Sequence, residues 1–247
     1  MNILKLRSNK FPIRYGVPHG FHIGYINPKE EEKSTWTKVV DKRASIGYSY
    51  GSTVNMYIPL SSLTPSRVLM NVPNINFSWT YSTGNELIIH LPYFKLRYYY
   101  YGDSPGFYPG HEYSLITTTK ADNKENKVTF HNSGRNMLNN FTLDWDASSR
   151  KVIVHTSDNP INEDNPGEKW ESDPLDLSTL KLTYPEPYGT DEVPAPPMIF
   201  ITHNAITNSS MANLDMENLS WSESETTTNH LDIDSWNAIV DSNTPKP

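Results

Sequence analysis

NFTLDWD (residues 140–146), ASSR (147–150) and KVIVHT (151–156) follow one another along the chain and decide its fold. Apolar and polar residues alternate in the first and third stretches, as in strands with one buried face, and the middle stretch contains turn residues. The sequence therefore predicts an antiparallel β-hairpin. We expect Thr142, Asp144 and Asp146 on the face that meets water or a neighbour. The opposite, buried face comprises Phe141, Leu143, Trp145, Val152 and Val154.

Further short runs of β-favouring residues lie on both sides of this hairpin, separated by turn sequences. Pro92 must divide the most apolar run into two strands or lie at a sheet edge, and Gly51 is expected to mark a bulge. No long helix is predicted, apart from one or two turns within residues 233–240. The pattern indicates an all-β fold, an antiparallel β-sandwich with jelly-roll-like connectivity. The other expected strands cover residues 35–40, 45–58, 68–81, 86–101, 112–119, 127–131, 179–184 and 198–203.

The two ends of the chain differ in composition from its middle. Prolines and glycines recur through residues 1–34, which close on the charged run Lys29–Lys33, so no long regular element fits there. Ser, Thr, Asn, Asp and Glu dominate residues 204–247, and such segments seldom bury enough surface to offset the entropy of ordering. We therefore expect a loop-rich N-terminal arm (1–34), a β-sandwich domain (35–203) and an extended polar C-terminal tail (204–247).

Composition excludes several function classes. The 247 residues have a formal net charge of −7, which repels nucleic-acid phosphates, so direct nucleic-acid binding is not expected. The chain contains no cysteine, which excludes disulfides, thiolate metal sites and cysteine nucleophiles. Aromatic residues reach 12%, with 15 Tyr and 6 Trp, a content that suits strands and adhesive surfaces.

No targeting or membrane segment is predicted. Residues 1–7 lack the apolar core and the small-residue cleavage site of a signal peptide. The sequence also lacks an apolar run long enough to cross a bilayer, so we expect no membrane insertion. These features fit a protein made and assembled in a cytoplasm.

Catalytic motifs are missing from the sequence. It has no Gly-x-Ser-x-Gly elbow, phosphate-binding loop or dinucleotide fingerprint, so we expect neither an enzyme nor a bound cofactor. Asp144 and Asp146 are the carboxylates that a glycosidase could use as acid and base. Carboxylates two residues apart on a strand are more often charges that keep an edge soluble.

Two stretches contain metal-ligand residue types. His19 and His22 are three residues apart, but they lie in a glycine-rich loop without a third ligand at suitable spacing. Residues 158–165 gather the oxygen ligands that Ca²⁺ prefers, without the order of an EF-hand. We therefore expect a hydrogen-bonded loop and a solvated turn, and no metal site.

Aromatic residues cluster near the middle of the chain. Their flat rings could stack on sugars, or they could equally form a subunit interface. Alternate strand residues point to opposite faces, so at most two of the four consecutive tyrosines can share one surface, and the other two are expected to enter the core. The cluster comprises Tyr98, Tyr99, Tyr100, Tyr101, Phe107 and Tyr108.

Isolated apolar residues punctuate the polar tail, as in segments that order on a partner by filling its pockets. This pattern favours a structural, self-assembling protein, most plausibly a component of a virus or phage particle: a capsid, coat-associated or tail protein. Its partners would be copies of itself and other particle proteins, and its location the virion. The expected tail anchors are Trp221, Leu231, Ile233, Trp236, Ile239 and Val240.

The same sandwich, with exposed tryptophan and tyrosine, also suits a different class of function. The alternative is a carbohydrate-binding, lectin-like or receptor-binding module. The two classes differ in what they predict: an assembly protein forms concentration-dependent oligomers, whereas a lectin binds a glycan as a compact unit.

Overall fold

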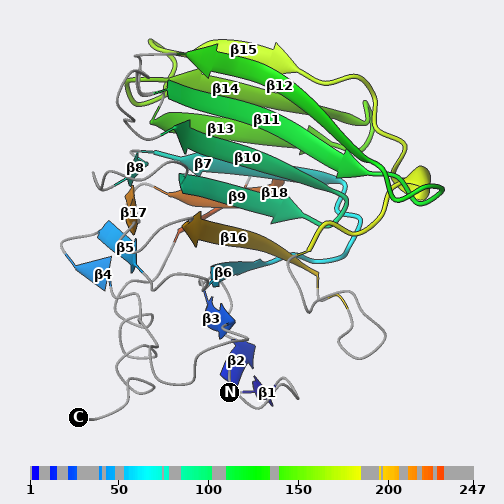
Figure 1. Cartoon of the computed structure of the whole chain (residues 1–247), viewed down its shortest axis with the longest axis horizontal. Helices are drawn as coiled ribbons and strands as arrows, with labels where there is room; N and C mark the ends of the chain where they lie inside the picture. The colour runs from blue at the N-terminus through cyan, green and yellow to red at the C-terminus, as the bar shows by residue number, and fades with distance from the viewer. Residues whose placement is uncertain are drawn as a thin grey trace.

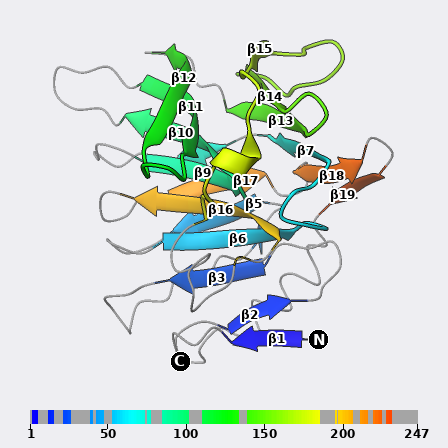
Figure 2. The ribbon, with the colours of Figure 1, turned by 90° about the vertical axis from the view of Figure 1, so that its right-hand side faces the viewer.

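The chain is an all-β protein in which two antiparallel sheets pack face to face as a sandwich (Figures 1 and 2). The computed structural model describes residues 2–5, 12–15, 22–26, 39–40, 43–47, 53–73, 75–77, 85–101, 110–133, 139–184, 195, 197–205, 211–215, 219–224 and 227–230. The predicted fold class is confirmed. The chain passes repeatedly from one large sheet to the other, as jelly-roll-like connectivity implies.

One face of the sandwich is a seven-stranded sheet with the order β12-β11-β10-β9-β16-β6-β3. Strands β9 to β12 form a meander, and β16 pairs with both β9 and β6. The strands are β3 (His22–Ile26), β6 (Thr53–Pro59), β9 (Asn85–Leu91), β10 (Phe94–Tyr101), β11 (Gly110–Thr118), β12 (Glu125–Ser133) and β16 (Met198–Ala205).

The other face is a six-stranded sheet with the order β15-β14-β13-β7-β18-β19. Strand β7 lies between β13 and β18, which are distant in sequence, and joins them through antiparallel pairing. The strands are β7 (Arg67–Val72), β13 (Asn140–Asp146), β14 (Lys151–Ser157), β15 (Glu168–Glu171), β18 (Ser220–Ser224) and β19 (Thr227–His230).

Two smaller sheets and a short helix complete the described elements. The four-stranded sheet contains β4 (Val39–Val40), β5 (Arg43–Gly47), β17 (Met211–Asp215) and β8 (Asn76–Phe77) in that order. The two-stranded sheet pairs β1 (Asn2–Lys5) with β2 (Pro12–Tyr15). The 3₁₀ helix η1 (Leu177–Thr179) is capped by the Asp176 carboxylate, which accepts from the Ser178 N–H at 3.1 Å. No helix within the described ranges has the length and apolarity needed to cross a membrane.

The hydrophobic core fills the space between the two large sheets. Aromatic rings connect the layers: Phe94 lies 5.5 Å from Trp145, and Tyr113 lies 5.9 Å from Phe141, both measured between ring centroids. The indole N–H of Trp145 donates to the Pro65 carbonyl at 3.2 Å, so its polar atom is satisfied inside the core.

The hairpin that predicted the fold is confirmed in detail. Leu143 pairs with Val154 and Trp145 with Val152, and all four side chains are buried. The four-residue turn ends on Arg150, whose φ of 59° is left-handed. The Asp146 carboxylate stabilises this turn by accepting from the Ser148 N–H at 2.9 Å.

The predicted division at Pro92 is also confirmed, because Pro92 lies in the turn between β9 and β10. Two of the segments predicted as single strands each form two strands. Residues 45–58 contribute β5 to the four-stranded sheet and β6 to the seven-stranded sheet, and residues 68–81 contribute β7 to the six-stranded sheet and β8 to the four-stranded sheet. Gly51, where a bulge was expected, and the possible helical turns in 233–240 lie outside the described residues.

Residues 179–184 were predicted to be a strand, and that prediction is wrong. Leu180 makes a single bridge to Thr119, and the chain then crosses the ends of other strands. The Thr183 N–H donates to the Pro92 carbonyl at 2.9 Å, and the Thr183 hydroxyl donates to the Leu91 carbonyl at 2.8 Å. The segment is therefore held at scattered points of the seven-stranded sheet and does not extend it.

The described parts of both ends of the chain contribute strands. Within residues 1–34, β3 pairs with β6 in the seven-stranded sheet. Within residues 204–247, β17 joins the four-stranded sheet, and β18 pairs with β7. Trp221 on β18 is 4% exposed and belongs to the main core. The sheets therefore extend beyond the limits of 35–203 that composition suggested.

Trp221→Ala should lower the free energy of unfolding by about 3–5 kcal/mol, because it removes a large buried side chain and leaves a cavity. Denaturant titration followed by circular dichroism measures the loss. Glu163→Ala, at an exposed loop position, is the control and should change stability by less than about 0.5 kcal/mol. Unchanged stability of the Trp221 variant, with weaker association between chains, would instead indicate an anchor on a neighbouring subunit.

Two buried histidines predict a pH-dependent stability. Burial lowers the pKa of His90 to about 4 from 6.5, against the opposing effect of its Nδ1–H bond to the Thr183 carbonyl. Burial also lowers the pKa of His111 to about 4. Both imidazoles are therefore neutral in the folded protein at pH 5, whereas in the unfolded chain they are mostly protonated.

The free energy of unfolding should thus fall as the pH drops from 6.5 to 4, by about 3 kcal/mol for His90 alone, and the histidine contribution to the loss should level off below pH 4. Urea titrations at intervals between pH 7 and 4 measure the slope. His90→Gln removes one titrating group and should flatten it. An identical slope for the variant and the parent protein would contradict the assignment.

Candidate functional site

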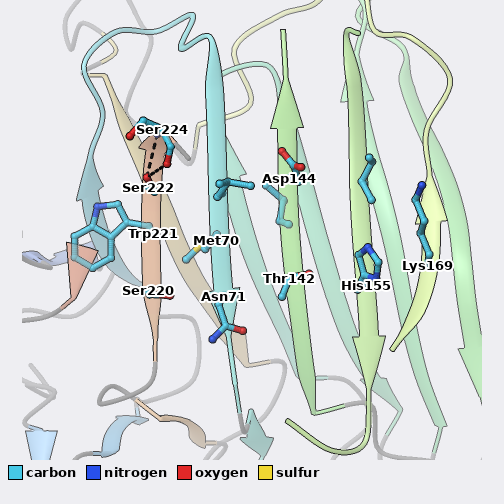
Figure 3. Close-up of a pocket in the computed structure, with 13 residues that line it drawn as sticks. Met70, Asn71, Thr142, Asp144, His155, Lys169, Ser220, Trp221, Ser222 and Ser224 are labelled. Atoms are coloured by element: carbon cyan, nitrogen blue, oxygen red, sulfur yellow. Dashed lines mark hydrogen bonds between the residues drawn. The ribbon is translucent and has the colours of Figure 1, made fainter. Parts of the chain in front are cut away.

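A hollow of about 480 Å³ lies against the outer face of the six-stranded sheet (Figure 3). The strands that border it send alternate residues inward to the core and outward to the hollow. On β13, Phe141, Leu143 and Trp145 are buried, while Thr142 and Asp144 border the hollow. The hollow and the core are thus built from the same strands.

A polar row crosses five neighbouring strands at the hollow. Its members are directly opposite one another in the register, and all five line the hollow, as Figure 3 shows. With strands spaced about 4.8 Å apart, the row spans about 19 Å. From β18 to β15, the polar row is Ser220, Asn71, Thr142, His155 and Lys169.

A second row, parallel to the first, mixes apolar and charged residues. Leu69 and Ile153 supply apolar surface, and Asp144 lies between them in the register. Ser222 begins this row on β18, and Glu171 ends it on β15. A ligand lying across the strands would therefore meet hydrogen-bonding groups along one side and aliphatic surface along the other, the combination usual in small-molecule sites.

Asp144 is held by an arginine from the neighbouring strand. The Arg67 Nε and Nη2 atoms donate to the two carboxylate oxygens at 3.0 and 2.9 Å, which makes the pair bidentate. The side chains are 30% and 26% exposed, so solvent screens the pair incompletely. This contact fixes the Asp144 carboxylate and neutralises its charge.

The Asp146 carboxylate, by contrast, binds the hairpin turn. Hydrogen bonds from the Ser148 hydroxyl and N–H lower the pKa of the Asp146 carboxyl, and the nearby Arg67 guanidinium adds to the effect. A general acid working near neutral pH needs a raised pKa instead. With Asp144 bound to Arg67 and Asp146 bound to the turn, the two carboxylates considered as acid and base stabilise the strands that carry them.

The β15 end of the hollow carries a small ionic cluster. Glu171 accepts from Lys151 and from Lys169, the latter at 3.1 Å, and these bonds lower the pKa of the Glu171 carboxyl. His155, opposite Lys169, donates from Nδ1 to the Pro166 carbonyl at 2.8 Å. The β15 end of the hollow is thus lined by a cationic donor, Lys169, and by the imidazole of His155.

The aromatic cluster does not contribute to this hollow. Tyr98 on β10 is 2% exposed and stacks on Tyr113 in the core, with ring centroids 4.5 Å apart. Tyr99 points to the opposite face, where the Arg97 guanidinium lies 4.3 Å from its ring centroid. Tyr98 and Tyr99 thus lie on opposite faces of β10, one in the core and one at the surface. Tyr100 and Tyr101 continue β10, and Phe107 and Tyr108 lie outside the described residues.

Among the expected tail anchors, the structure describes Trp221, which is buried in the core of its own chain and also borders the hollow. The remaining anchors lie outside the described residues, as does His19; His22 is the first residue of β3. Those remaining anchors are Leu231, Ile233, Trp236, Ile239 and Val240.

The loop at 158–165 uses its polar side chains for internal hydrogen bonds. The Asn162 Oδ1 atom accepts from the Asp164 and Asn165 N–H groups, both at 2.9 Å. In the described part of the chain, no group of three or more His, Asp or Glu side chains is placed to hold a metal ion.

Sequence reasoning missed most of the polar row. The hairpin register could have placed Thr142 beside His155, since both lie on its outward face. Asn71 and Ser220 join them because β7 and β18 pair with the hairpin over long sequence separations, which leaves no local signal.

Comparison with known proteins yields structures of similar fold at low identity. No protein-family model and no curated sequence matches the chain. A legume lectin-like domain from Entamoeba histolytica is 12% identical, with a TM-score of 0.47 over 82% of this chain and 90% of that one. The CBM2 module of the evolved Dit of Lactobacillus casei BL23 phage J-1 is 11% identical, with a TM-score of 0.38 over 78% and 73%. LamAcat from Zobellia galactanivorans is 7% identical, with a TM-score of 0.34 over 85% and 79%. Similarities this low do not indicate what the chain binds.

Proposed function

We propose that the chain is a carbohydrate-binding β-sandwich module whose site is the hollow on the six-stranded sheet. The polar row carries the proposal: five consecutive strands each contribute one hydrogen-bonding side chain in register along the hollow. Sugars present closely spaced hydroxyls that can both donate and accept, and such a row offers partners of both kinds.

The shape of the hollow supports an oligosaccharide. Its volume of about 480 Å³ is within the range of ligand sites, and the row runs across the strands. Leu69 and Ile153 offer aliphatic surface for the apolar faces of sugar rings. The hydroxyl, amide and imidazole groups beside them would set orientation and specificity.

Binding, and not hydrolysis, is the activity proposed. Asp144 is occupied by Arg67, and the pKa of Asp146 is lowered, so neither carboxylate is prepared to protonate a leaving group. Release of reducing ends from an oligosaccharide, abolished by Asp144→Asn, would instead favour the glycosidase alternative.

Thr142→Val combined with Ser220→Ala should weaken oligosaccharide binding about 30-fold, because two hydrogen bonds of about 1 kcal/mol each are lost. The measurement is calorimetry on the tightest binder of an array that includes cellohexaose, maltohexaose and hexagalacturonate. Thr129→Val is the matched control, since Thr129 is exposed on the opposite sheet. Equal affinity of the double variant and the control would remove the hollow as the binding site.

The role in a virus or phage particle stays a prediction, and a carbohydrate-binding module could serve such a particle by recognising a receptor. Its test requires the intact chain. Truncation after residue 203 would remove Leu219 and Trp221 from the core, so a loss of mass or solubility would report unfolding and not lost assembly. Light scattering of the full chain across a concentration series measures self-association directly.

A further inference from the structure

The loop between β14 and β15 ends beside the polar row. It carries no recognisable motif, yet its last residues contact His155, the fourth member of the row. The contact between the loop and His155 affects which ligand groups the hollow can bind. This inference rests on the proposed function.

The loop is stiffened by side-chain hydrogen bonds. Asn162 accepts from two N–H groups of its own turn. The Asn165 amide donates from Nδ2 to the Ser157 hydroxyl and to the Pro160 carbonyl, both at 3.0 Å. These bonds tie the end of the loop to the end of β14, so Pro166 is held close to the sheet.

Gly167 fixes the approach of the loop to the strand. Its φ of 73° is left-handed, and a Cβ atom there would lie 2.6 Å from the Thr156 carbonyl oxygen. A residue with a side chain at this position would therefore be strained and would also clash with backbone. Glycine lets the chain pass against β14, with the preceding Pro166 carbonyl oxygen 2.8 Å from Nδ1 of His155.

The Pro166 carbonyl decides which imidazole nitrogen of His155 carries the proton. A carbonyl oxygen can only accept, so Nδ1, at 2.8 Å, must be the N–H donor. In the neutral imidazole, Nε2 then has a free lone pair and can only accept. The side chain borders the hollow between Thr142 and Lys169 of the polar row.

We propose that the loop makes His155 a specificity-determining acceptor, so that the ligand must place a hydroxyl donor over β14. Gly167 and Pro166 are positioning residues, because they act through the tautomer of His155. A sugar hydroxyl that donates to Nε2 can also accept a hydrogen bond. Lys169, opposite His155 in the row, can only donate, so one hydroxyl could bond to both side chains. Ligands whose oxygens at this position are capped or ionised cannot make that bond.

The tautomer can be read without any ligand. In histidine-labelled protein at pH 8, the ¹⁵N spectrum should show His155 with a protonated Nδ1 and a bare Nε2; His155→Gln assigns the signals. Gly167→Ala and, independently, Asn165→Ala should shift the population toward the other tautomer, whereas Glu163→Ala in the same loop should not. A protonated Nε2 in the parent protein would overturn the proposal.

Binding supplies the second readout, with the tightest member of the oligosaccharide array as the probe. His155→Phe keeps a ring but has no acceptor, and should weaken binding about fivefold, whereas His155→Gln can restore an acceptor and should recover part of the loss. On saturation, the bare Nε2 signal of the parent protein should move toward the protonated position. An unmoved signal in a tight complex would refute the contact. If no oligosaccharide binds, the proposed function fails, and the spectrum alone then decides the tautomer.

Discussion

The alternation of side chains along β7 and β13 is the constraint on which the rest of the structure depends. A strand sends successive residues to opposite faces, so the register that buries Val68, Met70, Leu143 and Trp145 also presents the intervening residues to the hollow. A shift of the strand register by one residue would expose the core side chains and would also turn the residues of the polar row away from the hollow. Stability and the proposed recognition therefore cannot vary independently on these strands.

Charges on the outer face reinforce the same register. Arg67 binds Asp144 diagonally across β7 and β13, and Lys151 and Lys169 converge on Glu171 across β14 and β15. Exposed pairs contribute little to stability, but the bidentate and half-buried Arg67–Asp144 pair orients a carboxylate within the hollow. Hydrogen bonds lower the carboxyl pKa of Asp146 and of Glu171, and Arg67 occupies Asp144, which is why binding is proposed in preference to acid–base catalysis.

The loop between β14 and β15 has no regular secondary structure, yet its hydrogen bonds hold it in one position against the sheet. Composition makes its asparagines possible calcium ligands, but Asn162 accepts from two backbone N–H groups, and Asn165 donates to the Ser157 hydroxyl and to the Pro160 carbonyl. Their combined effect is to place a single carbonyl on His155. Composition could not reveal this, because an oxygen-rich loop can either bind a cation or fold on itself, and only its geometry distinguishes the two.

The sequence by itself determined the all-β class, the 140–156 hairpin with its register, and the break at Pro92, because each depends on alternation or turn chemistry within a few residues. Only the tertiary structure decided that 179–184 runs across strand ends and that Trp221 enters the core. It also decided that Asn71, Thr142 and Ser220 share one row. These features depend on pairing between strands that are far apart in the chain, and local sequence carries no record of which strands will become neighbours.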